Sequence, residues 1–164
     1  MPILLGFLLL TILVILQSAV VSRMPLLLGT PDLIFLTITA WAVRPRVRTA
    51  WHWAIIGGLL ASLTTALPFG TLLIAYLITT GLAIYFRQRV WRVPVLAMLT
   101  IAFIGTLLTN ALAVLAISLS GTLLPLLQAI NLVIIPSLLL NILLALPVYL
   151  IIGDVADRLY PEEL

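Results

Sequence analysis

The segment Pro136-Ser137-Leu138-Leu139-Leu140-Asn141-Ile142-Leu143-Leu144-Ala145-Leu146-Pro147-Val148-Tyr149-Leu150 decides how this chain can fold. It is apolar enough for the hydrocarbon core of a membrane, yet it contains two prolines and one amide. Ser137 and Asn141 are four residues apart, so on a helix they share one face. An amide in lipid without a hydrogen-bonding partner costs a few kcal/mol. We therefore expect a membrane helix whose polar edge packs against neighbouring helices.

The composition of the whole chain indicates an integral membrane protein. Of its 164 residues, 64% are hydrophobic and only 8% are charged, and the mean hydropathy is +1.35. A soluble domain is about 25% charged, so no soluble fold could bury this much apolar surface. The first apolar segment, 3–21, lacks a basic leading region and a small-residue cleavage site, so we expect it to remain as a helix.

Charged residues divide the chain into apolar segments, which we compare with the roughly 20 residues that a membrane-spanning helix needs. Segment 31–43 is short and is expected to be a tilted span with Pro31 in its first turn. Segment 125–135 is expected to form a short interfacial or re-entrant helix. The expected fold is an all-α polytopic membrane protein, one compact bundle of about six helices in a single domain, 1–164. The expected spans are 3–22, 31–43, 49–67, 69–86, 93–118 and 132–153.

The arginines predict the orientation of the bundle, because basic residues concentrate in cytoplasmic loops. All basic side chains except His52 are arginines. With both arginine-rich loops inside, seven arginines are cytoplasmic and only Arg23 is outside, which places both termini in the cytoplasm. The tryptophans flank the same loops and are expected to form an aromatic belt at the inner interface. The seven are Arg44, Arg46, Arg48, Arg87, Arg89, Arg92 and Arg158.

Three blocks of the sequence resemble the MreD family of small membrane proteins of the bacterial cell-elongation machinery. Block 136–150 resembles the last membrane helix of that family, block 22–33 its first connection, and block 58–70 its central hairpin. The family frequently has an acidic residue at the position of Ser62, and this sequence departs from that pattern.

The resemblance implies a function as well as a location. It implies a non-enzymatic protein of the bacterial cytoplasmic membrane that binds the membrane helix of MreC and supports lateral peptidoglycan synthesis and cell shape. Through MreC it would influence the RodA glycosyltransferase and its class B penicillin-binding transpeptidase, together with the actin-like MreB. It also implies a fold like that of the small substrate-binding subunits of energy-coupling-factor transporters.

Several polar and small residues are candidates for partner binding or helix packing. Small side chains at helical spacing on the third span allow close helix approach, which favours internal packing over a partner site. Arg23 and Asp32 are expected at the outer surface, either as a docking point for a partner or as a local ion pair. Asn110 and Asn141 are expected to bond to each other between helices, unless they line a substrate pocket. The candidates are Arg23, Asp32, Gly57, Gly58, Ala61, Ser62, Asn110, Ser137 and Asn141.

The residues that catalysis and ion transport need are missing from the expected spans. We count no charged side chain at membrane depth, where ion-coupled transporters carry ionisable groups. Zinc, nucleophile-elbow and phosphate-loop motifs are absent, and there is no cysteine. We therefore expect no enzymatic activity, cofactor or metal site. The alternative is a small-molecule-binding subunit of an energy-coupling-factor-type vitamin transporter, which needs a polar outward pocket.

Single cysteines test the predicted topology, because the chain has none of its own. Thr30→Cys, Leu67→Cys and Gly121→Cys should react with an impermeant maleimide added outside the cell. Val47→Cys and Glu163→Cys should react only after permeabilisation. Protection of Gly121→Cys together with labelling of Glu163→Cys in intact cells would contradict six crossings.

Overall fold

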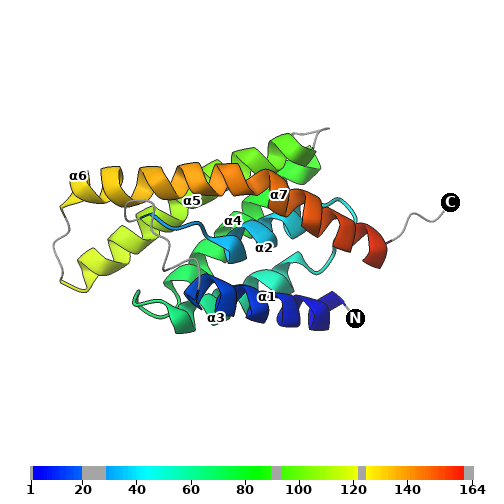
Figure 1. The fold of residues 1–164 in the computed structure, drawn as a ribbon, viewed down its shortest axis with the longest axis horizontal. Helices are drawn as coiled ribbons and strands as arrows, with labels where there is room; N and C mark the ends of the chain where they lie inside the picture. Colours follow the sequence, from blue (N-terminus) through cyan, green and yellow to red (C-terminus); the bar gives the residue numbers. More distant parts are fainter. Residues whose placement is uncertain (1, 20–28, 90–93, 122–124, 161–164) are drawn as a thin grey trace.

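The structure, a computed structural model, describes residues 2–19, 29–89, 94–121 and 125–160, and its regular structure there is helical, with no strand. Four of the described helices are long and apolar enough to cross a membrane, and α2 and α3 are shorter. This agrees with a membrane bundle (Figure 1). The helices are α1 (Pro2–Ala19), α2 (Leu33–Val43), α3 (Ala50–Thr64), α4 (Thr71–Arg89), α5 (Pro94–Leu119), α6 (Leu126–Ala129) and α7 (Ile135–Leu159).

Helix α2 lies in the centre of the bundle, in contact with α1, α3, α4, α5 and α7. Ten of its 11 residues are buried, as expected for a short helix that is apolar on every side. At 1.5 Å per residue it is about 16 Å long, roughly half the hydrocarbon thickness of a bilayer. Helix α2 begins at Leu33 with Asp32 as its N-cap residue. Pro31 precedes the cap, so the prediction that it lies in the first helical turn is wrong. The predicted span 31–43 is therefore a core helix whose first turn lies inside the bundle.

The prediction of a separate interfacial or re-entrant helix at 125–135 is wrong. Helix α6, a π-helical turn (Ile130–Ile134) and α7 form one continuous helix. Pro136 has no N–H to donate to the preceding turn, which favours a break in the helix at this point. A π-helical turn before it, in which the Ile135 N–H donates to the Ile130 carbonyl, accommodates this irregularity without ending the helix.

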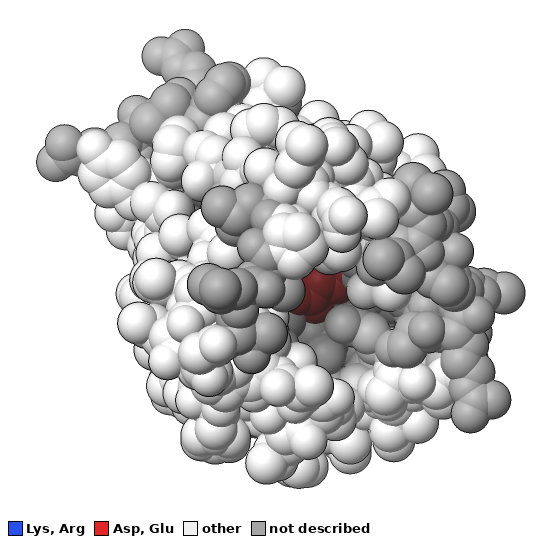
Figure 2. Space-filling view, turned by 90° about the vertical axis from the view of Figure 1, so that its left-hand side faces the viewer, with Lys and Arg blue, Asp and Glu red and all other residues white. Residues whose placement is uncertain are grey.

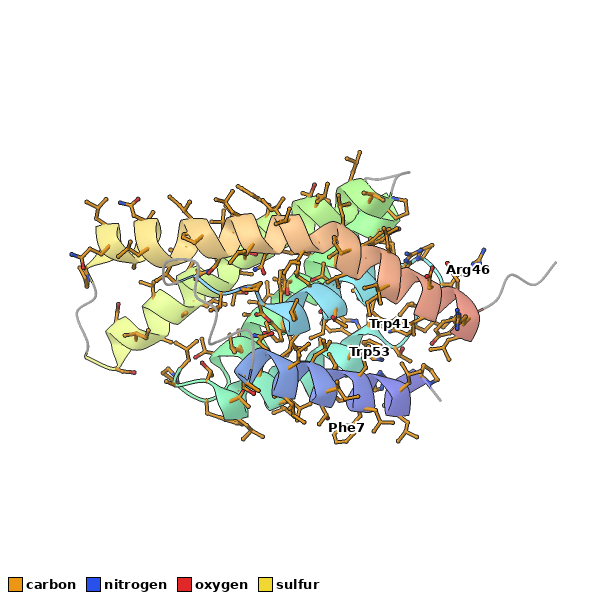
Figure 3. The ribbon with its side chains drawn as sticks, viewed as in Figure 1. Phe7, Trp41, Arg46 and Trp53 are labelled. Carbon is orange, nitrogen blue, oxygen red and sulfur yellow. The ribbon has the colours of Figure 1, made fainter. Side chains whose placement is uncertain are left out.

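Two of the four tryptophans lie in the core, so the predicted interfacial belt is wrong for them. Trp41 and Trp53 are both 0% exposed, and their rings stack at a centroid distance of 4.1 Å with 7° between the planes (Figure 3). The Trp53 indole N–H donates to the Pro2 carbonyl at 3.1 Å. Trp51 is exposed, and Trp91 is outside the described residues. The stacked pair therefore connects the end of α2, where Trp41 lies, to the beginning of α3, where Trp53 lies. Through the bond to Pro2 it also connects both to the beginning of α1.

The small residues of α3 lie against neighbouring helices of the same chain. A Cβ at Gly57 would meet Ile38 of α2 at 2.5 Å, and a Cβ at Gly58 would meet the Cα of Leu73 in α4 at 2.7 Å. Ala61 and Ser62 are also buried, at 3% and 5% exposure. This stripe therefore sets how closely α2 and α4 approach α3.

Replacing Gly58 by alanine should loosen the α3–α4 contact. The added methyl group meets backbone atoms of Leu73, and overpacking of this kind costs about 1–3 kcal/mol. We expect a lower midpoint of thermal unfolding in detergent. Gly81→Ala is the matched control, because its Cβ would meet only the tip of the exposed Trp51 ring, at 3.3 Å, and alanine favours the helix by about 1 kcal/mol. Equal midpoints for both variants would contradict the role assigned to Gly58.

Candidate functional site

The N-terminal turn of α2 is held by side chains of other helices. The Asp32 N–H donates to Asn141 Oδ1 of α7 at 2.8 Å, and the Leu33 N–H donates to Gln17 Oε1 of α1 at 2.9 Å. Asp32 caps its own helix, accepting at Oδ1 from the Phe35 N–H at 3.0 Å. These are amides that an α-helix cannot satisfy internally, so α1 and α7 supply the acceptors that water would supply at a surface.

Asp32, expected at the outer surface of the bundle, lies half-buried between helices. Its Oδ2 accepts from the hydroxyl of Tyr76 at 2.6 Å; Tyr76, in α4, is 0% exposed, and Asp32 itself is half-buried. A charged side chain therefore lies between helices of the bundle, at the start of α2. Arg23, the predicted partner of Asp32, is outside the described residues.

Asn141 and Asn110 do not bond to each other as expected but share Thr106 as a partner. Asn141 Nδ2 donates to Thr106 Oγ1 at 2.9 Å, and Asn110 Nδ2 donates to the Thr106 carbonyl at 2.8 Å. Asn141 is 2% exposed and Ser137 is 7% exposed, in agreement with a polar edge of α7 that faces protein. Asn141 therefore connects α7 to both α2 and α5.

A cavity of about 170 Å³, here called the Asp32 cavity, opens beside this network. Figure 2 shows that end of the molecule, with an acidic side chain at the bottom of a hollow and no basic side chain of the described residues on that face. The hydroxyl of Thr109, on its wall, is buried and has no hydrogen-bonding partner. The polar lining consists of Gln17, Thr30, Asp32, Thr106, Thr109, Asn110, Ser137 and Asn141.

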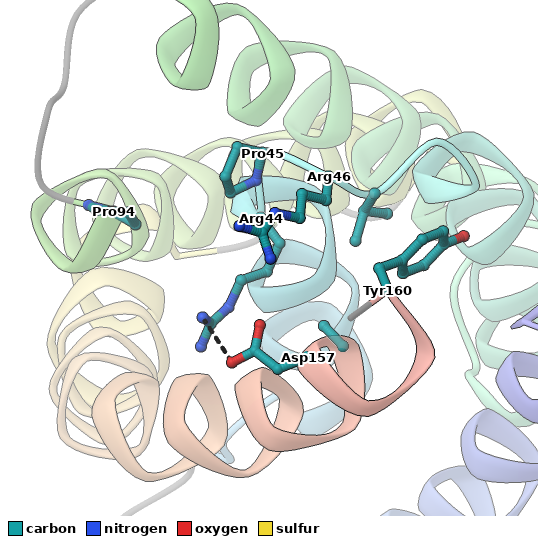
Figure 4. Close-up of a pocket in the computed structure, with 8 residues that line it drawn as sticks. Arg44, Pro45, Arg46, Pro94, Asp157 and Tyr160 are labelled. Carbon is teal, nitrogen blue, oxygen red and sulfur yellow. Dashed lines mark ion pairs between the residues drawn. The ribbon is translucent and has the colours of Figure 1, made fainter. Parts of the chain in front are cut away.

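A second cavity, of about 290 Å³, lies at the opposite end of α2 and is lined by Arg44, Arg46, Asp157 and Tyr160 among others (Figure 4). The guanidinium of Arg44 stacks on the Tyr149 ring at 4.2 Å and donates to the Tyr149 carbonyl at 3.1 Å. Its ion pair with Asp157 is long, at 3.9 Å, and Asp157 is 66% exposed, so that pair contributes little. Arg44 therefore ties the end of α2 to α7.

Arg87 holds the C-terminal end of α2. Its Nη1 donates to the carbonyls of Ala42 at 3.1 Å, Arg44 at 2.7 Å and Val47 at 3.1 Å. A cation at this position also complements the negative end of the helix dipole. The sequence predicted Arg87 as a loop residue, but it lies in the last turns of α4, from which its long side chain reaches the end of α2.

The structure thus brings four of the predicted residues together at the Asp32 cavity: Asp32, Asn110, Ser137 and Asn141. Gly57, Gly58, Ala61 and Ser62 lie elsewhere, in helix contacts of α3. Tyr76 is the residue of the network that sequence reasoning missed, since a single tyrosine in an apolar span carries no distinguishing pattern. Among the described residues no cluster of three or more His, Asp or Glu could hold a metal ion. The arrangement places polar side chains beside an open space, which is chemically suited to a polar ligand.

No model of a known protein family matches the chain, and no curated protein or solved structure matches it significantly.

Replacing Asn141 by leucine should destabilise the bundle. The change removes the acceptor of the Asp32 N–H and the donor to Thr106, and each buried group left without a partner costs about 1–3 kcal/mol. We expect a lower midpoint of thermal unfolding in detergent. Leu143→Ala is the control on the same helix, because Leu143 is 70% exposed. An unchanged midpoint for Asn141→Leu would show that these two bonds do not hold α7 in place.

Proposed function

We propose that this chain is an MreD-like membrane component of the bacterial cell-elongation machinery, a binding protein without chemistry of its own. It would lie in the cytoplasmic membrane with both termini inside and bind the membrane helix of MreC. Through MreC it would support the RodA glycosyltransferase and its transpeptidase partner, in concert with MreB. The support comes from the sequence resemblance and from one observation on the structure.

That observation is that described residues from each of the three resembling blocks lie at one cavity. Asp32 from block 22–33, Leu67 from block 58–70 and Asn141 from block 136–150 all line the Asp32 cavity, and Asp32 and Asn141 are joined by a 2.8 Å hydrogen bond. When several segments far apart in a sequence resemble one family, one explanation is that they form a single site in the folded chain. The exposed apolar side chains of the bundle, such as Phe7 on α1 (Figure 3), offer surfaces on which a single membrane helix can pack.

A second function is favoured by the same cavity. A small-molecule-binding subunit of an energy-coupling-factor transporter needs a polar pocket on the outer side, and the predicted orientation places the Asp32 cavity there. Its volume of about 170 Å³ is below the roughly 300–1,000 Å³ of pockets that enclose a drug-sized ligand. A vitamin would therefore require the cavity to widen, which makes this the weaker of the two proposals.

Affinity purification from the native membrane separates the two functions. The tagged chain, extracted in mild detergent, should retain MreC, identified by mass spectrometry; a transporter subunit should retain an ATPase module instead. An unrelated polytopic protein of the same membrane with the same tag controls for non-specific retention. Recovery of the ATPase module without MreC would replace the first proposal by the second.

A further inference from the structure

We propose that the Asp32 cavity binds a primary ammonium group, carried either by a small free amine or by the ethanolamine headgroup of a phospholipid. The inference rests on the cavity and its polar lining and does not depend on MreC binding. It goes beyond helix packing, since it assigns a ligand to the carboxylate between the helices.

The charge of Asp32 is the first argument. Its carboxylate accepts hydrogen bonds from the Phe35 N–H and the Tyr76 hydroxyl, and Gln17 also bonds to it. All three partners are neutral. The ion pair found among the described residues joins Arg44 to Asp157, at the opposite end of α2. Among the described residues, which do not include Arg23, no cation forms an ion pair with this carboxylate. A carboxylate between helices is costly without a cation, and a cationic ligand would offset that cost.

The arrangement of acceptors selects the type of cation. An ammonium group is a compact charge with three donors and no acceptor. The cavity offers it the Asp32 carboxylate, the unpartnered Thr109 hydroxyl and the hydroxyl of Ser137. A guanidinium prefers to bind both carboxylate oxygens at once, whereas the Phe35 N–H and the Tyr76 hydroxyl already occupy one lone pair on each oxygen of Asp32. An ammonium needs only one of the lone pairs that remain. A quaternary ammonium has no N–H, so it would leave the Thr109 hydroxyl unpartnered.

Size and access restrict the ligand further. A volume of about 170 Å³ accommodates a short aminoalkyl group and excludes a folded domain. Calcium and magnesium prefer six or more oxygen ligands in a defined geometry, whereas Asp32 is the one acidic residue among the described residues that line the cavity. The cavity opens at the end of the bundle (Figure 2), where both dissolved amines and lipid headgroups are present.

The test uses the whole protein in nanodiscs of phosphatidylcholine and phosphatidylglycerol. One arm adds ethanolamine or choline and measures the thermal unfolding midpoint. The other exchanges part of the phosphatidylcholine for phosphatidylethanolamine and measures by native mass spectrometry which lipid stays bound. If the ligand is a free amine, we expect the unfolding midpoint to rise with ethanolamine and not with choline. If the ligand is a lipid headgroup, we expect phosphatidylethanolamine to be enriched several-fold among the bound lipids. No preference in either arm overturns the proposal.

Two variants connect any preference to the cavity. Asp32→Asn removes the charge but keeps the size and an acceptor for the helix cap, and we expect it to lose the preference, by about tenfold in affinity. Asp157→Asn, at the opposite end, should retain it. If Asp32→Asn does not fold, Thr109→Val decides: it removes one hydroxyl at constant size and should weaken binding several-fold. If the variant that folds prefers ethanolamine or phosphatidylethanolamine as strongly as the unchanged protein does, the proposal is overturned.

Discussion

The structure depends on one constraint: helix α2 begins among the other helices, and its first amides bond to side chains of α1 and α7. Every α-helix leaves its first amides and last carbonyls without internal partners, and within a membrane such groups must be satisfied by the protein itself. At the start of α2, Asn141 and Gln17 accept from the backbone; at its end, Arg87 donates to three carbonyls. The surrounding helices are therefore fixed by the groups they direct at α2 as well as by apolar packing.

The distribution of charge follows from the same constraint. A helix dipole favours an anion at the N-terminal end and a cation at the C-terminal end, and α2 has Asp32 at the first and Arg87 at the second. The arginines of loop 44–48 lie at the second end as well, beside the stacked pair Trp41–Trp53. The arginines that predict topology thus include residues that hold the fold together.

Sequence reasoning located the helices because charges and turn residues interrupt the apolar segments. It also predicted that the polar edge at Ser137 and Asn141 faces protein, since an unpaired amide is costly in lipid. It placed Asp32 at the outer surface, because a charge usually marks the end of a membrane segment, whereas its carboxylate lies between helices. It predicted a separate helix at 125–135 from the spare length of a charge-free run, whereas that segment continues into α7. The three-dimensional partners of Asp32, above all Tyr76, have no signature in the linear sequence.

The length of α2 explains why a cavity exists at all. Eleven residues cover about half of the hydrocarbon thickness, so α2 does not extend along the whole length of this central position. Side chains of α5 and α7 that would otherwise contact a longer α2 instead line an open space. The carboxylate that caps the helix also faces this space, so capping and ligand binding depend on the same residue. Substitutions at Asp32 that change its shape therefore disturb folding and binding together, and only an isosteric change such as asparagine separates them.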